Sequence, residues 1–213
     1  DDISSIKNTA STYGFSFIEI NSNKDFDDEK KQVNIKYSIN EGPKVYINKI
    51  TINGNTRTAD RVIRRQLSIT EGDSYSKYLI NLSENKIKAL QYFSKVKITE
   101  ERDDAFDKIN LTINVEEKNT GEASIGAGYS SNSKASLQLG ITEENFLGKG
   151  QQLKFESSLG DEFTAYDISF AEPYFYERDL YIKGELYSEL QDSASVNYET
   201  EKVGFGIALG FPL

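Results

Sequence analysis

Apolar residues are spaced differently in the two parts of the chain. Up to residue 118, segments with alternating apolar positions are interleaved with segments of helical spacing. From residue 122 onward, almost every segment alternates apolar residues with polar or small ones, as a strand with two unlike faces does. The spacing changes within the stretch from Val115 to Tyr129, V-E-E-K-N-T-G-E-A-S-I-G-A-G-Y, which we interpret as a domain boundary.

The first 42 residues predict a helix followed by two strands. Apolar residues recur at helical spacing until Tyr13-Gly14 ends the helix, and a strand begins at Phe15. The charged residues 24–31 predict an exposed hairpin loop. The returning strand is predicted by four alternating apolar residues: Val33, Ile35, Tyr37 and Ile39.

Residues 44–118 predict the element order β-α-α-β-β. A strand ends at Asn53-Gly54-Asn55, and Thr58 is expected to cap a helix that runs through Leu67. Ser76 is expected to cap a second helix to about residue 90, and strands follow near residues 93–98 and 109–115. The second helix is expected to bury four residues: Leu79, Leu82, Ile87 and Leu90.

The pattern of residues 15–41 recurs about 76–78 residues later. Phe15 aligns with Phe93, and residues 33–41 align with residues 109–117. We therefore interpret residues 1–41 as the second half of a module of the same kind.

Six successive segments after residue 122 each have one apolar face and one polar or small face. A soluble β-sandwich and a transmembrane β-barrel share this pattern, so alternation alone leaves both open. The segments run about 9–12 residues, whereas soluble strands usually run about 5–6, which favours the barrel. Aromatic residues that cluster at strand ends favour it too: Tyr174, Phe175, Tyr176 and Tyr181.

Composition limits the functions that the chain could have. The net charge is −9 and the Lys and Arg residues are scattered, which argues against a nucleic-acid partner because phosphate recognition needs clustered positive charge. The sequence has no Cys and no His, which removes thiol catalysis, histidine acid–base catalysis and the commonest zinc ligands. The longest nearly apolar run, Phe205 to Leu213, is far shorter than the about 20 residues of a membrane-spanning helix.

Two acidic clusters and one acidic pair are candidates for a metal site or a catalytic site. The clusters lack the ligand spacing and the glycine of a calcium loop, so we interpret both as exposed hairpin loops. Glu143 and Glu144 are adjacent in a strand and point to opposite faces, so they cannot flank one substrate bond. No enzyme motif is found, and we expect neither catalysis nor a cofactor nor a metal. The clusters are Asp25, Asp27, Asp28, Glu29 and Asp103, Asp104, Asp107.

Four motifs in order resemble those of the BamA family of outer-membrane β-barrel assembly factors. They are V-x-E-x-N-T-G from Val115 to Gly121, the glycine-rich strand after it, N-F-L-G-K-G from Asn145 to Gly150, and E-P-Y-F from Glu172 to Phe175. The resemblance implies α+β POTRA (polypeptide-transport-associated) modules followed by antiparallel strands of an incomplete transmembrane β-barrel. It divides the chain into the C-terminal part of a penultimate POTRA domain (1–42), the last POTRA domain (43–118) and the first six barrel strands (119–213).

The resemblance also implies a location and partners. Residues 1–118 would lie in the periplasm and the strands in the outer membrane of a Gram-negative cell. The partners would be unfolded outer-membrane proteins, periplasmic assembly lipoproteins and outer-membrane lipid. Arg64-Arg65-Gln66-Leu67 and Glu71-Gly72 are similar to a family stretch that contacts such a lipoprotein, so Arg64 and Glu71 are the candidate contact residues, against an alternative of a solvated helix end and turn.

The implied function is insertion of β-barrel proteins by β-augmentation, at POTRA edges and at the first barrel strand. Two alternatives remain open: a two-partner-type secretion pore with POTRA domains, and a soluble β-sandwich surface antigen. The client-pairing strand would consist of Glu122, Ala123, Ser124, Ile125, Gly126, Ala127, Gly128, Tyr129 and Ser130.

Overall fold

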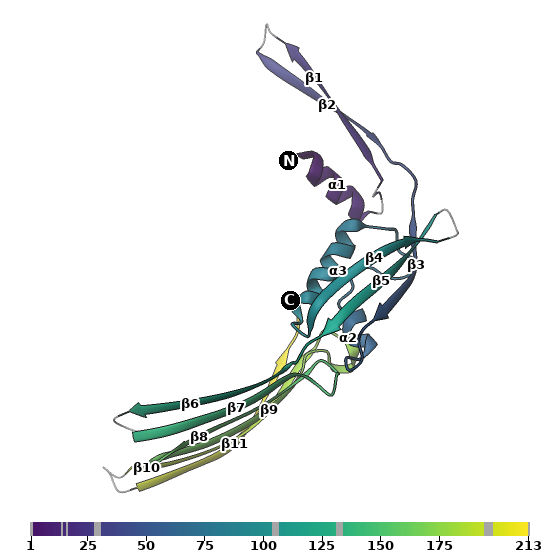
Figure 1. The fold of residues 1–213 in the computed structure, drawn as a ribbon. Coiled ribbons are helices and arrows are strands. Elements are labelled where there is room, and N and C mark those ends of the chain that lie inside the picture. Colours follow the sequence, from purple (N-terminus) through teal and green to yellow (C-terminus); the bar gives the residue numbers. More distant parts are fainter. Residues whose placement is uncertain are drawn as a thin grey trace. The chain divides into compact units, whose positions relative to one another are not determined.

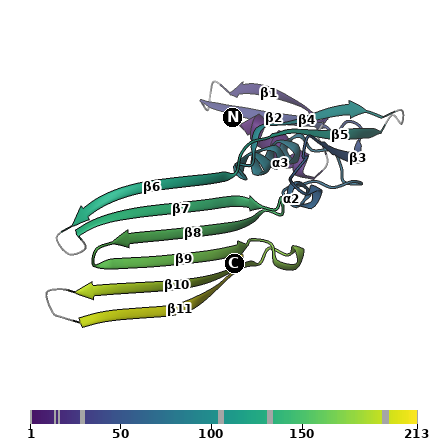
Figure 2. The same cartoon turned by 60° about the horizontal axis from the view of Figure 1, so that its bottom comes forward.

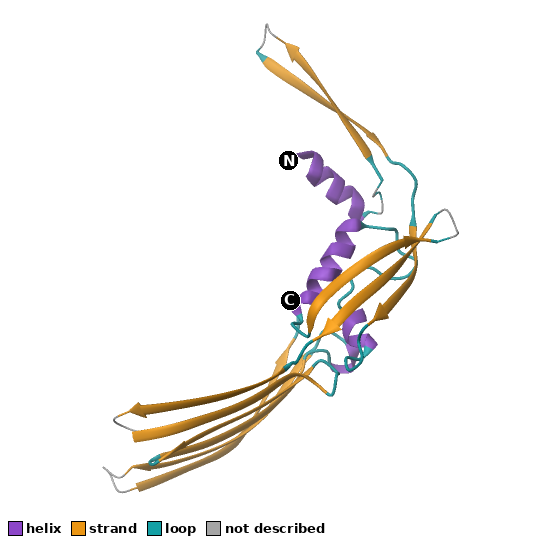
Figure 3. Cartoon of the chain, viewed as in Figure 1, coloured by secondary structure: helices purple, strands orange, loops and turns teal. Residues whose placement is uncertain are grey.

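The computed structural model describes residues 2–13, 15, 17–27, 31–103, 107–130, 134–193 and 198–212 (Figure 1). The chain forms two compact units. The first consists of Asp1–Asn55 and Ile63–Glu117, and the second of Thr56–Val62 and Lys118–Leu213. The α-helices fall within the first half of the chain, and extended strands dominate the second (Figure 3).

Residues 44–118 form the predicted β-α-α-β-β order: β3 Tyr46–Asn53, α2 Asp60–Arg64, α3 Lys77–Ala89, β4 Phe93–Arg102 and β5 Lys108–Glu117. The sheet order is β3-β5-β4, with β5 parallel to β3 and antiparallel to β4. The strands carry alternating apolar residues because successive side chains point to opposite faces. Ile47, Leu111 and Ile113 are accordingly buried on one face, and Ile80 and Ile87 of α3 are buried as well.

Helix α3 confirms one predicted cap and corrects the predicted buried face. Ser76 is the N-cap and accepts a hydrogen bond from the Leu79 N–H at 3.3 Å. Ile80, Ser83 and Ile87 are the buried residues of the helix, whereas Leu79 and Leu82 are half-buried. The prediction was right for Ile87, whereas Leu90 is half-buried and Ile80 and Ser83 are buried in place of Leu79 and Leu82. The Ser83 hydroxyl is satisfied within the helix, because it donates to the Leu79 carbonyl at 2.7 Å.

Helix α2 is shorter than predicted, running from Asp60 to Arg64 instead of from Thr58 through Leu67. The position before its first residue is Ala59. Thr58 is buried, and its hydroxyl accepts a hydrogen bond from the Asn145 amide at 2.9 Å. The Thr58 hydroxyl therefore has a partner 87 residues away in sequence, and the helix ends three residues earlier than predicted.

Residues 2–40 form α1 Asp2–Thr12, β1 Glu19–Asp27 and β2 Gln32–Asn40, the predicted helix, strand and strand. Residues 24–27 belong to β1, so the prediction of a loop was wrong for them; Asp28 and Glu29 lie outside the described residues. The hairpin resembles β4–β5 with one difference. Ile20 pairs with Ile39, while the aligned Ile98 pairs with Ile113, an offset of two residues that keeps the apolar residues on one face of the hairpin.

The second unit contains six antiparallel strands joined in chain order, from β6 at one edge to β11 at the other (Figure 2). The sheet does not close, since β6 and β11 are not paired with each other. The strands are β6 Gly121–Ser130, β7 Lys134–Phe146, β8 Gln151–Gly160, β9 Phe163–Glu172, β10 Tyr181–Ser193 and β11 Tyr198–Gly210. All six were predicted.

One face of this sheet is apolar and exposed. Cross-strand registers align one residue from every strand into a continuous apolar row: Ala123, Ile141, Phe155, Ile168, Leu186 and Phe205. Phe205 is 73% exposed and Leu186 is 61% exposed. Within the described residues no second sheet covers this face, which is not how a β-sandwich buries its core. No described helix is long and apolar enough to span a bilayer.

Candidate functional site

Arg64 and Glu71 lie together at the free edge of β3. The Arg64 Nη1 donates to Glu71 Oε1 at 3.0 Å, and Arg64 Nη2 donates to the Ile50 carbonyl at 2.8 Å. The Ile50 N–H donates to the same Glu71 Oε1 at 3.3 Å. The two predicted contact residues are therefore brought together, and both hydrogen-bonding groups of one edge residue are held between them.

The Glu71 carboxyl has a pKa below its ordinary value. Partial burial opposes the charged form, but hydrogen bonds from its own backbone and from Arg64, together with the Arg64 charge and the Ile50 N–H, outweigh it. The carboxylate is thus held charged at neutral pH, as the pair with Arg64 requires.

The rest of the β3 edge is covered by backbone. The Ile47 N–H donates to the Asp73 carbonyl at 2.9 Å, and the Gly72 N–H donates to the Ile47 carbonyl at 2.8 Å. The Tyr75 N–H donates to the Val45 carbonyl at 2.7 Å. The turn predicted at residues 71–73 therefore lies along β3, and its main chain makes hydrogen bonds with Ile47 as a neighbouring strand would.

The opposite edge of this sheet is β4. The Ile98 N–H donates to Glu84 Oε2 at 3.2 Å, and Glu84 also accepts from Lys88 Nζ at 2.5 Å. Since alternate residues of an antiparallel strand direct their main-chain groups to one side, the Ile98 bond identifies Val96, Ile98 and Glu100 as the residues that face outward. The Ile98 N–H on this edge is thus held by a side chain, as the Ile50 N–H is on β3.

Strand β6 has one neighbour, β7, among the described residues. Ile125 and Tyr129 on its apolar face are 76% and 78% exposed. Gly126 and Gly128 lie on the other face, opposite Gln138 and Ser136. The predicted pairing strand, residues 122–130, is therefore an edge strand with small residues on its polar face.

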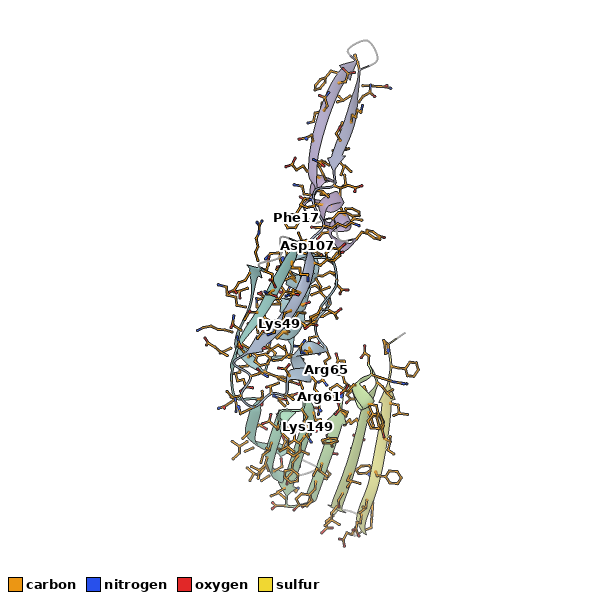
Figure 4. The ribbon with its side chains drawn as sticks, turned by 90° about the vertical axis from the view of Figure 1, so that its right-hand side faces the viewer. Phe17, Lys49, Arg61, Arg65, Asp107 and Lys149 are labelled. Atoms are coloured by element: carbon orange, nitrogen blue, oxygen red, sulfur yellow. The ribbon has the colours of Figure 1, made fainter. Side chains whose placement is uncertain are left out.

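A junction that sequence reasoning did not assign forms around Asn145 in the second unit. Asn145 Oδ1 accepts from the Gly150 N–H at 2.8 Å, while its amide donates to Thr58. The Ala59 N–H donates to the Gly148 carbonyl at 2.8 Å. The N-F-L-G-K-G motif was the available signal: it builds the β7–β8 turn that holds Thr56–Val62. Figure 4 labels Arg61 and Lys149, which belong to these two segments.

The acidic groups have structural partners. Asp103 Oδ2 accepts from the Asn48 and Asn110 amides at 2.5 and 3.1 Å. Glu143 accepts from the Thr120 hydroxyl and from the Asn145 N–H, and Glu144 accepts from the Gln152 amide. Among the residues that the structure describes, no group of three or more acidic side chains could hold a metal ion; Asp104 lies outside them.

The aromatic residues predicted at strand ends surround the turn between β9 and β10. The short helix η1 Phe175–Glu177 occupies this turn, and Tyr181 begins β10. The rings of Phe175 and Tyr176 meet edge to face, with centroids 4.6 Å apart, and Tyr176 is 83% exposed. Exposed aromatic rings at strand ends are typical of the boundary between membrane and water.

Two family models match the chain. The model for POTRA, surface antigen variable number repeat, matches residues 45–118, and the Omp85 superfamily domain matches residues 145–213. The crystal structure of BamA from Haemophilus ducreyi lacking POTRA domains 1-3 is 28% identical, with a TM-score of 0.80, covering 99% of this chain and 40% of that chain. CdiB from Escherichia coli has a TM-score of 0.54 at 13% identity over 95% of this chain and 37% of that one, which shows likeness of fold alone.

Curated relatives agree with the family models. The outer membrane protein assembly factor BamA of Nitratidesulfovibrio vulgaris is 29% identical over 200 residues, covering 93% of this chain and 25% of the relative. BamA of Buchnera aphidicola is 30% identical over 176 residues, covering 82% of this chain and 28% of the relative. The chain spans about a quarter of the length of the curated relatives it matches.

The chain thus carries a POTRA domain followed by an open antiparallel sheet that matches the Omp85 superfamily domain. Over most of its length it is similar to BamA outer membrane protein assembly factors, at 27–30% identity. The comparisons support a location at the outer membrane, with a periplasmic segment.

Proposed function

We propose that the full-length protein folds and inserts β-barrel proteins into the outer membrane without enzymatic chemistry, by pairing client strands with β6. The observation that carries this proposal is the composition of β6, the first strand of the sheet, which has the small residues Gly126, Ala127 and Gly128 in its middle. Names of relatives support it, since several are outer membrane protein assembly factors.

An edge strand presents a row of unpaired N–H and C=O groups. In lipid, such groups are costly, so a seam that opens at β6 favours an incoming strand as the replacement partner. Main-chain pairing tolerates many sequences, which suits a protein with many clients. Gly126, Ala127 and Gly128 add little side-chain packing to the seam, which should make β6 the easiest strand to release.

A disulfide lock tests this role. Cysteines at Ser124 and at the facing position of the last barrel strand of the full-length protein would be oxidised, and insertion of a client barrel into proteoliposomes would be measured. Insertion should fall sharply and recover on reduction. The matched control locks Gln138 to Ser158, which face each other across β7 and β8, and should leave insertion unchanged. Normal insertion with the β6 seam locked would refute the mechanism.

The periplasmic step is proposed to occur at the edge of β4, which has β5 as its one neighbour among the described strands. Its outward main-chain groups would pair with an unfolded client before the client reaches the membrane. This places the first client contact on the POTRA domain.

A periplasmic lipoprotein is the proposed partner at Arg64 and Glu71. Both side chains are about two-fifths exposed, so a partner of complementary charge can reach them. Reversing either charge should weaken capture of the lipoprotein by the full-length protein. The control reverses Lys95, which forms a similar exposed pair with Glu116 at 3.0 Å. Equal capture by all variants would remove the docking role.

The domain assignment is part of the proposal. Residues 1–42 form the C-terminal part of a penultimate POTRA domain, 43–118 the last one, and 119–213 the first six barrel strands. The β1–β2 hairpin supports the first assignment because it has the connectivity of β4–β5. The secretion pore is the second candidate, since CdiB shares the fold; the disulfide lock separates the two, because a pore would not need the seam to open.

A further inference from the structure

On the outer edge of β3, the main-chain groups of Ile47 and of Ile50 are covered in two different ways. Ile47 is covered by the main chain of Gly72 and Asp73, which is a fixed part of the fold. Ile50 is covered by the side chains of Arg64 and Glu71. Side chains that are 40% and 42% exposed can rotate into solvent without unfolding the domain. The cover over Ile50 is therefore removable, whereas the cover over Ile47 is not.

Ile50 has the geometry of a strand acceptor. In a parallel pair, each residue directs both its N–H and its C=O to one side, and the next residue directs both to the other. The bonds to Glu71 and Arg64 show that both groups of Ile50 point away from β5. An extended chain laid along this edge could accept from the Ile50 N–H and donate to its carbonyl, and Ile52 faces outward in the same way.

We propose that Ile50 is the centre of a covered strand-acceptor site, whose ligand is an extended polypeptide main chain and whose cover is the Arg64–Glu71 pair. The inference rests on the proposed use of β-augmentation and adds a second acceptor to the β4 edge. The number of hydrogen bonds at Ile50 stays the same. A carbonyl of the incoming strand replaces the Glu71 carboxylate as the acceptor of the Ile50 N–H, and an N–H of that strand replaces Arg64 as the donor to the Ile50 carbonyl. Leaving Ile50 uncovered with no strand would cost two main-chain hydrogen bonds.

The cover couples Ile50 to docking at Arg64 and Glu71. While these side chains hold the Ile50 N–H and carbonyl, an incoming strand cannot pair with those groups. A protein partner that draws Arg64 and Glu71 to its own opposite charges would release Ile50 at the same time. Docking at this pair would thereby add a strand-acceptor site on β3.

The first test measures whether the pair is a cover. Hydrogen exchange would be followed by mass spectrometry for Tyr46–Asn53 in the full-length protein in lipid nanodiscs. Arg64→Ala with Glu71→Ala should raise the exchange rate of the Ile50 N–H within this segment about fivefold, the effect of losing one net hydrogen bond. Glu71→Gln keeps an acceptor for the Ile50 N–H and should give a smaller rise. Lys95→Ala with Glu116→Ala is the control and should leave the segment unchanged.

The second test measures strand acceptance. The probe is a synthetic peptide with the alternating sequence of β9, F-T-A-Y-D-I-S-F-A-E. A photo-crosslinking residue replaces Lys49, labelled in Figure 4 and next to Ile50, or Lys97 on β4. The double alanine variant should raise crosslinking from position 49 several-fold and leave position 97 unchanged. A peptide with prolines at alternate positions should not crosslink, because proline has no N–H to donate.

The outcomes separate this inference from the proposed function. Unchanged exchange in both Glu71 variants would show that the pair is no cover. Faster exchange without added crosslinking at position 49 would show that the uncovered edge accepts no strand. Absent crosslinking at position 97 would refute the β4 step while leaving the Ile50 site to be judged by position 49 alone.

Discussion

Gly54 follows β3 with φ +93°, in the left-handed region that side chains rarely adopt. A Cβ atom at this position would lie 1.9 Å from the Val115 carbonyl oxygen. Gly72 has nearly the same φ, +92°, but nothing lies within 4 Å of its Cβ position. The two glycines thus form a matched pair in one domain, since Gly72→Ala measures backbone strain alone and Gly54→Ala measures the same strain plus a collision.

The expected loss of stability for each variant follows from the surroundings of its glycine. A non-glycine residue in the left-handed region costs about 1–2 kcal/mol, which is the expected loss for Gly72→Ala. For Gly54→Ala, the Val115 carbonyl must also move by about 1.5 Å to restore an ordinary contact of 3.4 Å. Val115 is buried on the central strand β5 and pairs with Val96, so this shift disturbs the ladder. We expect a loss of about 4 kcal/mol or more, a large share of the roughly 5–15 kcal/mol that stabilises a domain.

Urea unfolding of residues 44–118, followed by circular dichroism, measures the difference. The unsubstituted segment should unfold in one cooperative transition from a mixed α/β spectrum. With a slope of about 1 kcal/mol per M urea, Gly72→Ala should lower the midpoint by about 1–2 M. Gly54→Ala should lower it by at least twice as much or leave the segment unfolded in buffer. Equal midpoints for the two variants would refute the collision with Val115.

Three further predictions concern the same domain. Tyr75→Phe should cost about 1–2 kcal/mol in urea unfolding, because the half-buried hydroxyl donates to Glu100 Oε2 at 2.6 Å, and an unchanged midpoint would contradict that bond. Ser76→Ala should cost about 1 kcal/mol, measured in the same way on residues 1–118, since Ser76 caps α3 and its hydroxyl lies 2.9 Å from that of Ser11. Because the pKa of Glu71 is lowered by folding, its charge stabilises the native state above the ordinary value of 4.5, and the stabilisation is lost as the pH falls through the folded pKa. The difference in urea midpoint between the natural protein and Glu71→Gln should therefore shrink from pH 7 to pH 3, and a constant difference would contradict the assignment.

The strands could be predicted because alternation is imposed by the backbone itself. In a strand, the side-chain period is two whatever the strand packs against, so Ile109, Leu111, Ile113 and Val115 identify one face of β5 without knowledge of its neighbours. The same reasoning identified all six strands of the second unit. Ser76 was predictable as well, since a cap bonds within its own helix turn.

The predictions that were wrong concern helix bounds and faces, which depend on contacts distant in sequence. Helix α2 ends at Arg64 instead of Leu67. In α3, Ser83 is buried instead of Leu82, although the prediction for Ile87 was right. Sequence similarity could select Arg64 and Glu71, but their joint hold on Ile50 depends on how the segment of residues 64–71 returns to β3, which no local pattern encodes.

The β3 edge of the POTRA sheet is covered by charged side chains, whereas β6 of the six-stranded sheet relies on pairing with another strand. The difference follows from the solvent around each edge. In the periplasm, water can satisfy an exposed N–H or C=O, so the β3 edge needs a cover to prevent unwanted strand pairing. In the membrane, nothing but another strand can satisfy the groups of β6, so its edge needs no cover to be selective. Charged side chains such as Arg64 and Glu71 can cover an edge in water but would be too costly beside β6 in lipid. A periplasmic edge can therefore be regulated by a partner that moves charges, whereas the membrane edge can be regulated only through the strand that pairs with it.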